Sequence, residues 1–376
     1  MQPRPFRSAG LRGRSLLARC LGITTLLTVP LLTGPVVGSA DTTSPSYSGR
    51  AYVLQASVLG TQPLRIADTG DVPSSGGAQE ASLLSVPQTS LGSAGAINGA
   101  EVAHATTVAQ GNASRSEASV ADLSVTVAGT TITADFLMSR AAAQCNGSSP
   151  SVSGSSELAA LAINGGQPIT VTEAPNQTIV LPLNAGTVVI NEQSSSLSGQ
   201  TGSMDVSALH VTISDPATGA PLADLIVSHA HADITCPASP SQPPACGVSP
   251  TDFVTGGGWI VSPSDPNAKA NFAVAGGVKN GFWGHLMYID HGNGMRVKRT
   301  GVTGYDFYPA FGSNGRQILG SADVSGTAEP YDADVADNGE PGARIDKFQL
   351  TLKKASVPTA TSLLSGGNIQ LHKACQ

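Results

Sequence analysis

Two histidine pairs in the sequence have spacings that could support chemistry. His229 and His231 lie two residues apart, so on a β-strand both imidazoles face the same side, a spacing that some metal sites use. A metal site also needs a third ligand, and the sequence identifies none nearby. The competing interpretation is that the two are ordinary polar residues on the solvent face of a strand.

The second group is His285, Asp290 and His291, which could supply an acid–base pair beside a nucleophile. The Gly-x-Ser-x-Gly elbow that presents a catalytic serine is absent, and no motif provides an oxyanion hole. We therefore interpret Asp290 as the residue that caps a hairpin turn over residues 290–294. No catalytic residues are predicted.

Oxygen ligands are concentrated between residues 332 and 340, where Asp332, Asp334, Asp337 and Glu340 follow one another closely. Ca²⁺ prefers six to eight oxygen ligands, so these four carboxylates could form a calcium site. Their spacing does not match the EF-hand loop, and an acidic loop closed by Asn-Gly and Pro-Gly turns is the alternative. No other cofactor is indicated.

Aromatic rings gather in the C-terminal third of the chain. Trp259, Trp283 and Tyr288 could form a platform on which a sugar or peptide ligand stacks. The alternative is that these rings fill the core, because this part of the chain has few other large apolar side chains.

The elements that would position these residues are β-strands. Short apolar runs alternate with Gly, Pro, Asn and Asp clusters along the chain, as expected for consecutive antiparallel strands. We predict an all-β protein with two antiparallel sandwich-like or barrel-like domains, residues 41–240 and 251–376, joined by a Pro-rich linker at 241–250. Twelve of the 16 aromatic residues lie beyond residue 250, which supports the division.

Three local patterns give more specific expectations. The Ser-, Gly- and Pro-rich segment 68–96 is predicted to be a surface loop, and the Ala-rich segment 139–144 a short helical turn. The run Gly256–Gly258 lies within a predicted strand. Because glycine is costly there, we expect another backbone or ring to approach it closely.

Residues 1–40 have the features of a secretory signal peptide: five arginines, an apolar stretch and small residues before a cleavage site after Ala40. Without these arginines, 15 basic residues face 26 acidic ones, a net charge of −11. That charge disfavours nucleic acid as a partner. The dozen apolar residues of the leader are too few to span a bilayer, and no later stretch is long enough. We expect a secreted, soluble protein without a membrane span after cleavage.

Four cysteines follow the leader, and an even number in an exported chain predicts two disulfides. Pairing within each domain gives Cys145–Cys236 and Cys246–Cys375, the second of which would join the two ends of one compact unit. A local Cys236–Cys246 bond is the alternative, but the Pro-rich segment between the two residues is stiff.

The motifs of the C-terminal part resemble the small domain that commonly follows the choice-of-anchor P region in exported bacterial proteins. They are Val254–Ile260 (V-T-G-G-G-W-I), Gly284–Leu286, Tyr288–His291, Asp337–Gly342 and Gly367–His372 with Cys375. The N-terminal half, from S-G-R-A-Y-V-L-Q-A-S-V-L-G at residue 48 to A-D-I-T-C at 236, resembles the choice-of-anchor P region itself. The resemblance implies an exported ectodomain without known catalytic residues.

From these features we expect a non-enzymatic structural or binding module of the bacterial surface or medium, whose partner is an unidentified cell-surface, glycan or protein ligand. Two alternatives stay open. One is a calcium-stabilised carbohydrate- or surface-binding module that uses the acidic loop and the rings. The other is a secreted hydrolase that uses His285 or His291.

Overall fold

A computed structural model of the protein describes residues 44–59, 62–91, 95–127, 129–172, 174–238, 252–353 and 362–373. Residues 42–376 belong to one compact unit. The predicted signal peptide, the whole predicted linker 241–250, Cys246 and Cys375 lie outside the described residues. The predicted division into two domains stays a prediction.

The all-β prediction is confirmed. The described residues form three antiparallel sheets, and their only helical elements are the 3₁₀ turns η2 (Pro182–Asn184) and η3 (Pro309–Phe311). Over the same residues, no helix has the length and apolar character needed to cross a bilayer.

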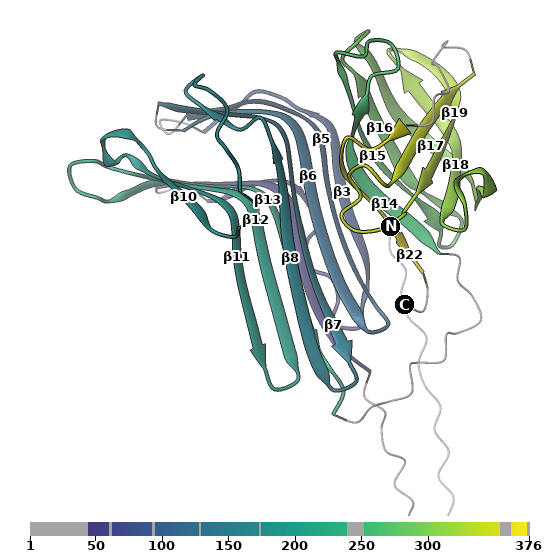
Figure 1. The fold of residues 1–376 in the computed structure, drawn as a ribbon, viewed down its shortest axis with the longest axis horizontal. Helices are drawn as coiled ribbons and strands as arrows, with labels where there is room; N and C mark the ends of the chain where they lie inside the picture. Colours follow the sequence, from purple (N-terminus) through teal and green to yellow (C-terminus); the bar gives the residue numbers. More distant parts are fainter. Residues whose placement is uncertain are drawn as a thin grey trace, which may run out of the picture. The chain divides into compact units, whose positions relative to one another are not determined.

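Two of the sheets come from the N-terminal half of the chain (Figure 1). Sheet A contains, in spatial order, β10 (Gln177–Val180), β11 (Gly186–Ser198), β12 (Thr201–Ser214), β13 (Pro221–Thr235), β1 (Ser46–Val58) and β2 (Leu64–Asp68). Sheet B contains β3 (Gly77–Val86), β5 (Gly95–Gln110), β6 (Ala113–Val127), β7 (Thr130–Asn146) and β8 (Ser149–Ala159), with β4 (Thr89–Ser90) paired to β5 and β9 (Ala162–Ile163) paired to β7.

Sheet C is built from the C-terminal part of the chain. Its spatial order is β21 (Ser362–Leu363), β20 (Lys347–Leu352), β19 (Thr327–Ala336), β18 (Gly315–Val324), β17 (Met295–Phe307), β16 (Phe282–Asp290), β15 (Lys269–Val278), β14 (Phe253–Val261) and β22 (Gly366–His372). Its concave face holds a separate core in which Phe272, Tyr288 and Phe348 stack.

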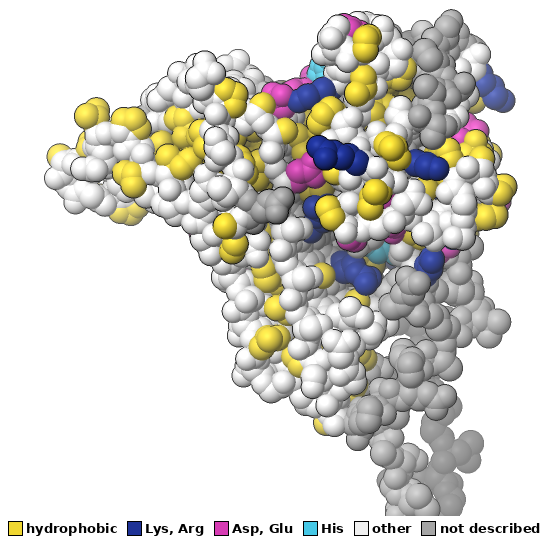
Figure 2. All heavy atoms as spheres, in the orientation of Figure 1, with side chains coloured by type: hydrophobic (Ala, Val, Ile, Leu, Met, Phe, Trp, Pro, Cys, Tyr) yellow, Lys and Arg dark blue, Asp and Glu magenta, His cyan; other side chains and the backbone are white. Residues whose placement is uncertain are grey.

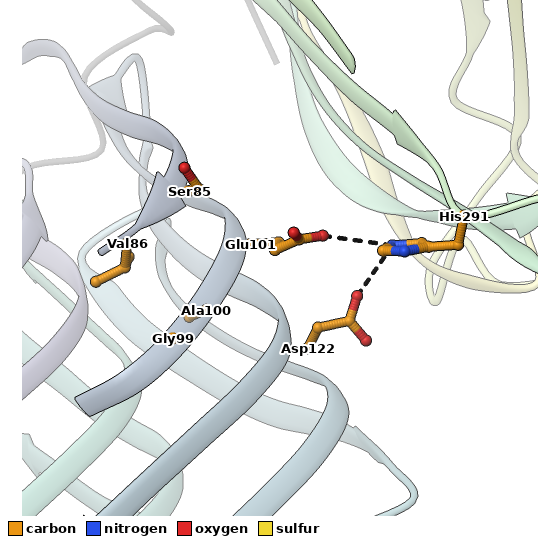
Figure 3. Close-up of a pocket in the computed structure, with 7 residues that line it drawn as sticks. All are labelled: Ser85, Val86, Gly99, Ala100, Glu101, Asp122 and His291. Carbon is orange, nitrogen blue, oxygen red and sulfur yellow. Dashed lines mark ion pairs between the residues drawn. The ribbon is translucent and has the colours of Figure 1, made fainter. Parts of the chain in front are cut away.

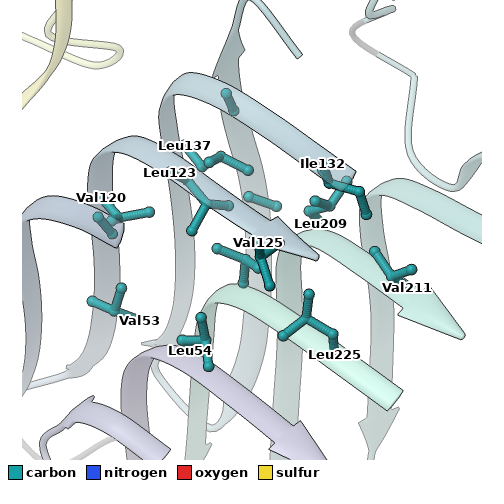
Figure 4. Close-up of a cluster of buried hydrophobic side chains, with 14 of the residues drawn as sticks. Val53, Leu54, Val120, Leu123, Val125, Ile132, Leu137, Leu209, Val211 and Leu225 are labelled. Atoms are coloured by element: carbon teal, nitrogen blue, oxygen red, sulfur yellow. The ribbon is translucent and has the colours of Figure 1, made fainter. Parts of the chain in front are cut away.

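Sheets A and B enclose an aliphatic core (Figure 4). Every second residue of the facing strands is apolar, as in Leu123, Val125 and Val127 of β6 and Leu209, Val211 and Ile213 of β12, and all six are buried. This alternation buries one face of each strand and leaves the other free for other contacts.

The long strands of both sheets bend part-way along their length (Figure 1). Four non-glycine residues within them adopt positive φ, between 46° and 56°; they are Val102 in β5, Asp122 in β6, Asn191 in β11 and Ser228 in β13. We call this set the kink row. Pairing is interrupted there: Tyr52 pairs with His229 and Leu54 with Val227, with no pair between them. A left-handed residue in a strand changes its direction and reverses which residues face inward.

Two local predictions were wrong. The predicted loop 68–96 contains strand β3, whose Ser, Gly and Ala content concealed a strand that pairs with β5 from Gly77 to Val86. The Ala-rich segment 139–144 continues strand β7, where Ala141 and Ala143 are buried in the core near Cys145. Small side chains fit between two closely packed sheets, so packing overrides the helix propensity of alanine.

The expected close approach at the glycine run is confirmed. A Cβ at Gly256 would lie 2.5 Å from the carbonyl oxygen of Asn368, and one at Gly258 would lie 2.3 Å from that of Gly366. At Gly257 it would lie 2.6 Å from Oγ of Ser119, on sheet B. The glycines therefore let β14 lie against β22 and sheet B at once.

The predicted Cys145–Cys236 disulfide is confirmed, with Cα atoms 5.6 Å apart. It joins the end of β7 in sheet B to the residue after β13 in sheet A, and both sulfur-bearing residues are buried. The covalent link therefore closes the sandwich at one end of its core.

Replacing both cysteines by serine should lower the free energy of unfolding by about 4 kcal/mol, because the bond closes a loop of 91 residues. Urea denaturation followed by intrinsic fluorescence measures the change. An unchanged midpoint would contradict this role for the bond.

Candidate functional site

Sheet B meets sheet C along a surface rich in ionisable side chains. At the level of the kink row, two consecutive residues on each of three strands contact sheet C, whereas a regular strand would present only one. The pairs are Glu101 and Val102 on β5, Ala121 and Asp122 on β6, and Asp135 and Phe136 on β7. The kinks at Val102 and Asp122, together with the missing pair between Asp122 and Asp135, thus add a row of three carboxylates, Glu101, Asp122 and Asp135, which we call the carboxylate row.

Basic groups of sheet C meet this row. His291, just after β16, has Nε2 3.0 Å from Oδ2 of Asp122 and 3.5 Å from Oε2 of Glu101. Arg296 on β17 donates to Glu101 at 2.6 Å, and Lys269 on β15 donates to Asp135 at 2.5 Å. Burial raises the pKa of Asp122, while the charge of His291 opposes that rise.

An open hollow of about 350 Å³ lies beside these pairs, lined by Ser85, Val86, Gly99, Ala100, Glu101, Asp122 and His291. Figure 3 shows Glu101 and Asp122 directed at His291, with Ser85 turned away from it. The acid and base groups of the hollow are therefore paired with one another.

A second cluster, with two buried histidines, lies on the same surface. It combines Glu80 on β3, His104 on β5 and His285 on β16, with one ligand atom from each within 4.8 Å of the others. Oε1 of Glu80 lies 2.8 Å from Nδ1 of His285. Burial raises the pKa of Glu80, but the charge and hydrogen bond of His285 outweigh it and hold that pKa at about 2. Burial lowers the pKa of His104 to about 3.

A third polar group surrounds Glu117 on β6. Asn368 of β22 donates to Oε2 of Glu117 at 3.3 Å and to Oε1 of Glu340 at 3.0 Å, and Arg140 lies 3.9 Å from Glu340. Burial raises the pKa of Glu117 to about 8 and that of Asp346 nearby to about 7. Burial at this junction thus favours the protonated form of both carboxyl groups.

The two histidines on β13 contact side chains of the neighbouring strand β12 in the same sheet. His231 Nδ1 lies 2.9 Å from Asp205 of β12, and His229 Nε2 lies 3.7 Å from the same carboxylate. Oγ of Ser207 is 3.0 Å from Nδ1 of His229. The two imidazoles share one face, as predicted, and Asp205 is a third polar group that the sequence did not reveal.

Asp290 caps the turn after β16, as predicted. Its Oδ1 accepts hydrogen bonds from the backbone N–H of Gly292 at 2.8 Å and from Ser262 at 2.5 Å. Strand β16 runs unbroken beside β15, so His285 and His291 lie on the same face, directed at sheet B.

The four carboxylates of the predicted calcium site are divided between two places. Gln317 donates to Asp332 at 3.0 Å and to Asp334 at 3.1 Å, and burial raises the pKa of Asp334 to about 7. Asp337 instead accepts from the backbone of Leu371 at 2.8 Å, and Glu340 from Asn368. Calcium at this loop stays a prediction.

The three rings of the predicted platform do not share one face. Tyr288 is 1% exposed and lies in the core of sheet C, with its ring stacked near Phe348. Trp259 packs against sheet B beside Phe136, and Trp283 contacts Phe253 on the outer face of sheet C. A ligand for the two tryptophans stays a prediction.

Sequence reasoning did not select Glu80, His104, Glu101 or Asp122. Glu80 lay in the predicted loop, and the other three were single polar residues within apolar strand patterns. One signal was available: in E-V-A-H-A-T, residues 101–106, polar residues interrupt the apolar pattern of the strand, which indicates that they face something other than the core.

No family model, curated protein or solved structure matches this chain in the comparisons with known proteins. The site is therefore interpreted from its own geometry.

Glu117→Gln should remove a pH dependence of stability. The folded-state pKa of Glu117, about 8, lies above the ordinary value of 4.5, so its stabilising protonated form is complete below pH 4.5 and lost as pH rises through 8. The variant should match the wild type near pH 5 and exceed its free energy of unfolding by on the order of 3 kcal/mol at pH 9. Urea denaturation across this pH range measures the difference, and a pH-independent difference would contradict the assignment.

Proposed function

We propose that this chain is an exported, non-enzymatic binding module of the bacterial surface or medium. The observation that carries the proposal is the mutual pairing of the acid and base groups at the hollow. A general base must be able to reach a substrate proton, and a nucleophile must lie within hydrogen-bond reach of its base. His291 is instead held between two carboxylates and Asn271, whose amide lies 3.0 Å from its Nε2.

These pairs hold two sheets together. Arg296 with Glu101, Lys269 with Asp135 and His291 with Asp122 each join sheet C to sheet B. Apolar contacts reinforce them where Val102 meets Met287 and Ile289. Such a junction favours a rigid scaffold that presents a surface, which is what a binding module needs.

The serine-rich ends of β8 and β11 offer a ligand contact of a particular character. In the view of Figure 2 charge gathers over sheet C and along its border with sheet B, whereas on β11–β13 Glu192, Asp205 and Asp224 are paired with histidines of the same sheet. The edge strand β8 exposes alternate serines, Ser149, Ser151, Ser153 and Ser155, and the end of β11 exposes Ser194, Ser195, Ser196 and Ser198. Rows of hydroxyls suit an uncharged, hydrogen-bonding partner such as a glycan or an extended protein segment.

The family resemblance and export belong to the same proposal. Proteins with the choice-of-anchor P pattern are exported, which agrees with the predicted signal peptide. The resemblance also supplies no catalytic residues, which agrees with a non-enzymatic role. A disulfide such as Cys145–Cys236 suits an oxidising compartment.

Expression of the full chain in a bacterial host with an export pathway should release a protein that begins at Asp41. Intact-mass analysis of the culture medium tests this. Recovery only of an uncleaved chain inside the cell would contradict export.

A screen of ester, glycoside and peptide substrates should find no turnover by the wild type above that of the His285→Ala and His291→Ala variants. Turnover that is present in the wild type and lost on either substitution would overturn the non-enzymatic assignment and favour the hydrolase alternative.

A further inference from the structure

We propose that Glu80, His104 and His285 form a binding site for a divalent transition-metal ion, such as zinc, that links sheet B to sheet C. This inference does not depend on the identity of the surface ligand. It concerns a site between the two sheets, away from the serine-rich edges.

The three residues converge from three strands. In the ladder of β3 and β5, Glu80 pairs with Thr106 and His104 pairs with Ser82, so Glu80 and His104 are diagonal neighbours on one face of sheet B. His285 comes from β16 of sheet C, opposite them. The rings of His104 and His285 have centroids 4.8 Å apart.

His104 is the strongest evidence for a ligand. Its exposed fraction is 0%, and neither Nδ1 nor Nε2 has a hydrogen-bond partner among the described residues. A neutral imidazole has one donor and one acceptor, and buried polar atoms are nearly always paired, because leaving them unpaired forfeits their hydration. Core packing alone would be served better by an apolar side chain. Coordination of a metal through one ring nitrogen gives His104 a partner.

The donor set suits a transition metal. Two imidazoles and one carboxylate bind zinc with metal–ligand distances near 2.0–2.2 Å, which place neighbouring ligand atoms about 3.3 Å apart on a tetrahedron. The Glu80 and His285 ligand atoms are already 2.8 Å apart, and all three lie within 4.8 Å of one another. Small side-chain rotations would complete the geometry. Calcium and magnesium, which prefer oxygen ligands, are disfavoured.

The surroundings support such a site. Ser82 donates a hydrogen bond to Oε1 of Glu80 at 2.8 Å, and second-shell partners of this kind orient metal ligands. Gly257 of β14 passes close to His104: a Cβ there would lie 3.7 Å from Cδ2 of the ring. The side chain of Glu80 is 26% exposed at the sheet edge, which gives an ion a route to the buried histidines.

The other cluster at the junction is a weaker metal site. Glu101, Asp122 and His291 also bring ligand atoms within 4.8 Å of one another. There, however, Arg296 already neutralises Glu101 at 2.6 Å, and Asn271 donates to Asp122 at 3.1 Å. A cation would have to compete with these partners. This cluster therefore supplies the matched controls.

The test is zinc titration of the chelator-treated full chain, by calorimetry and by thermal unfolding. We expect a single zinc ion per chain and a rise in Tm of about 5 °C at a zinc concentration near 100 times Kd, with no rise for Ca²⁺. His104→Leu and Glu80→Gln should each weaken zinc binding by more than about 100-fold, whereas His291→Ala should leave it unchanged. Bound Co²⁺ should give the visible absorbance of a four-coordinate site in the wild type and lose it in His104→Leu.

Folding of the variants is checked separately. Without metal, His104→Leu should be at least as stable as the wild type, because it removes two unpartnered buried nitrogens. Glu80→Gln lies on a partly exposed edge strand, so it tests the site even if the core variant unfolds. The proposal is overturned if the wild type binds no zinc, if both variants keep wild-type affinity, or if only His291→Ala loses it.

Discussion

The bend in the long strands of sheets A and B is the constraint on which the rest of the structure depends. The kinked strands β5, β6, β11 and β13 have 13 to 16 residues, well beyond the usual strand length, and sheets of such strands must twist or bend to stay packed. Placing non-glycine residues at positive φ costs about 1–2 kcal/mol each, and for a β-branched residue such as Val102 the conformation is a true outlier. The packed core on both sides of the kink row must offset this cost.

The kinks also determine which side chains reach sheet C. Because the interrupted alternation lets two consecutive residues of a strand face sheet C, Glu101, Asp122 and Asp135 are added to a face of sheet B that already carries Glu80, His104 and Glu117. Each carboxylate then meets a histidine, arginine or lysine from sheet C. Removing such charges from water is costly unless they are paired, so the two surfaces are complementary in charge as well as in shape. The glycine run of β14 completes the fit, since any side chain at Gly257 would collide with Ser119.

The junction therefore contains two kinds of polar group. The carboxylate row is partly exposed and is matched by basic partners, so it specifies how the sheets meet without needing a ligand. In the cluster of Glu80, His104 and His285 the two histidines are buried, and imidazole nitrogens are left unpartnered among the described residues. Polar groups that already have partners indicate a structural contact, whereas buried polar groups without partners indicate a candidate metal site. It also separates both from the serine-rich edges of β8 and β11, where hydroxyls face solvent and a partner would bind without desolvating charge.

The sequence by itself determined the all-β class, most strand positions, the turn cap at Asp290 and the Cys145–Cys236 pairing. The first three depend on alternation and turn residues, which are local signals, and the cysteine pairing followed from the expected domain division. It did not locate β3, because a strand rich in Ser, Gly and Ala resembles a loop until its partner β5 is present. It also could not bring Glu80, His104 and His285 together, since they lie on three strands in two sheets and up to 205 residues apart in the numbering. Only the tertiary structure decided that convergence. The direction in which a side chain near a kink points depends on how the two sheets pack, and its sequence neighbours do not determine it.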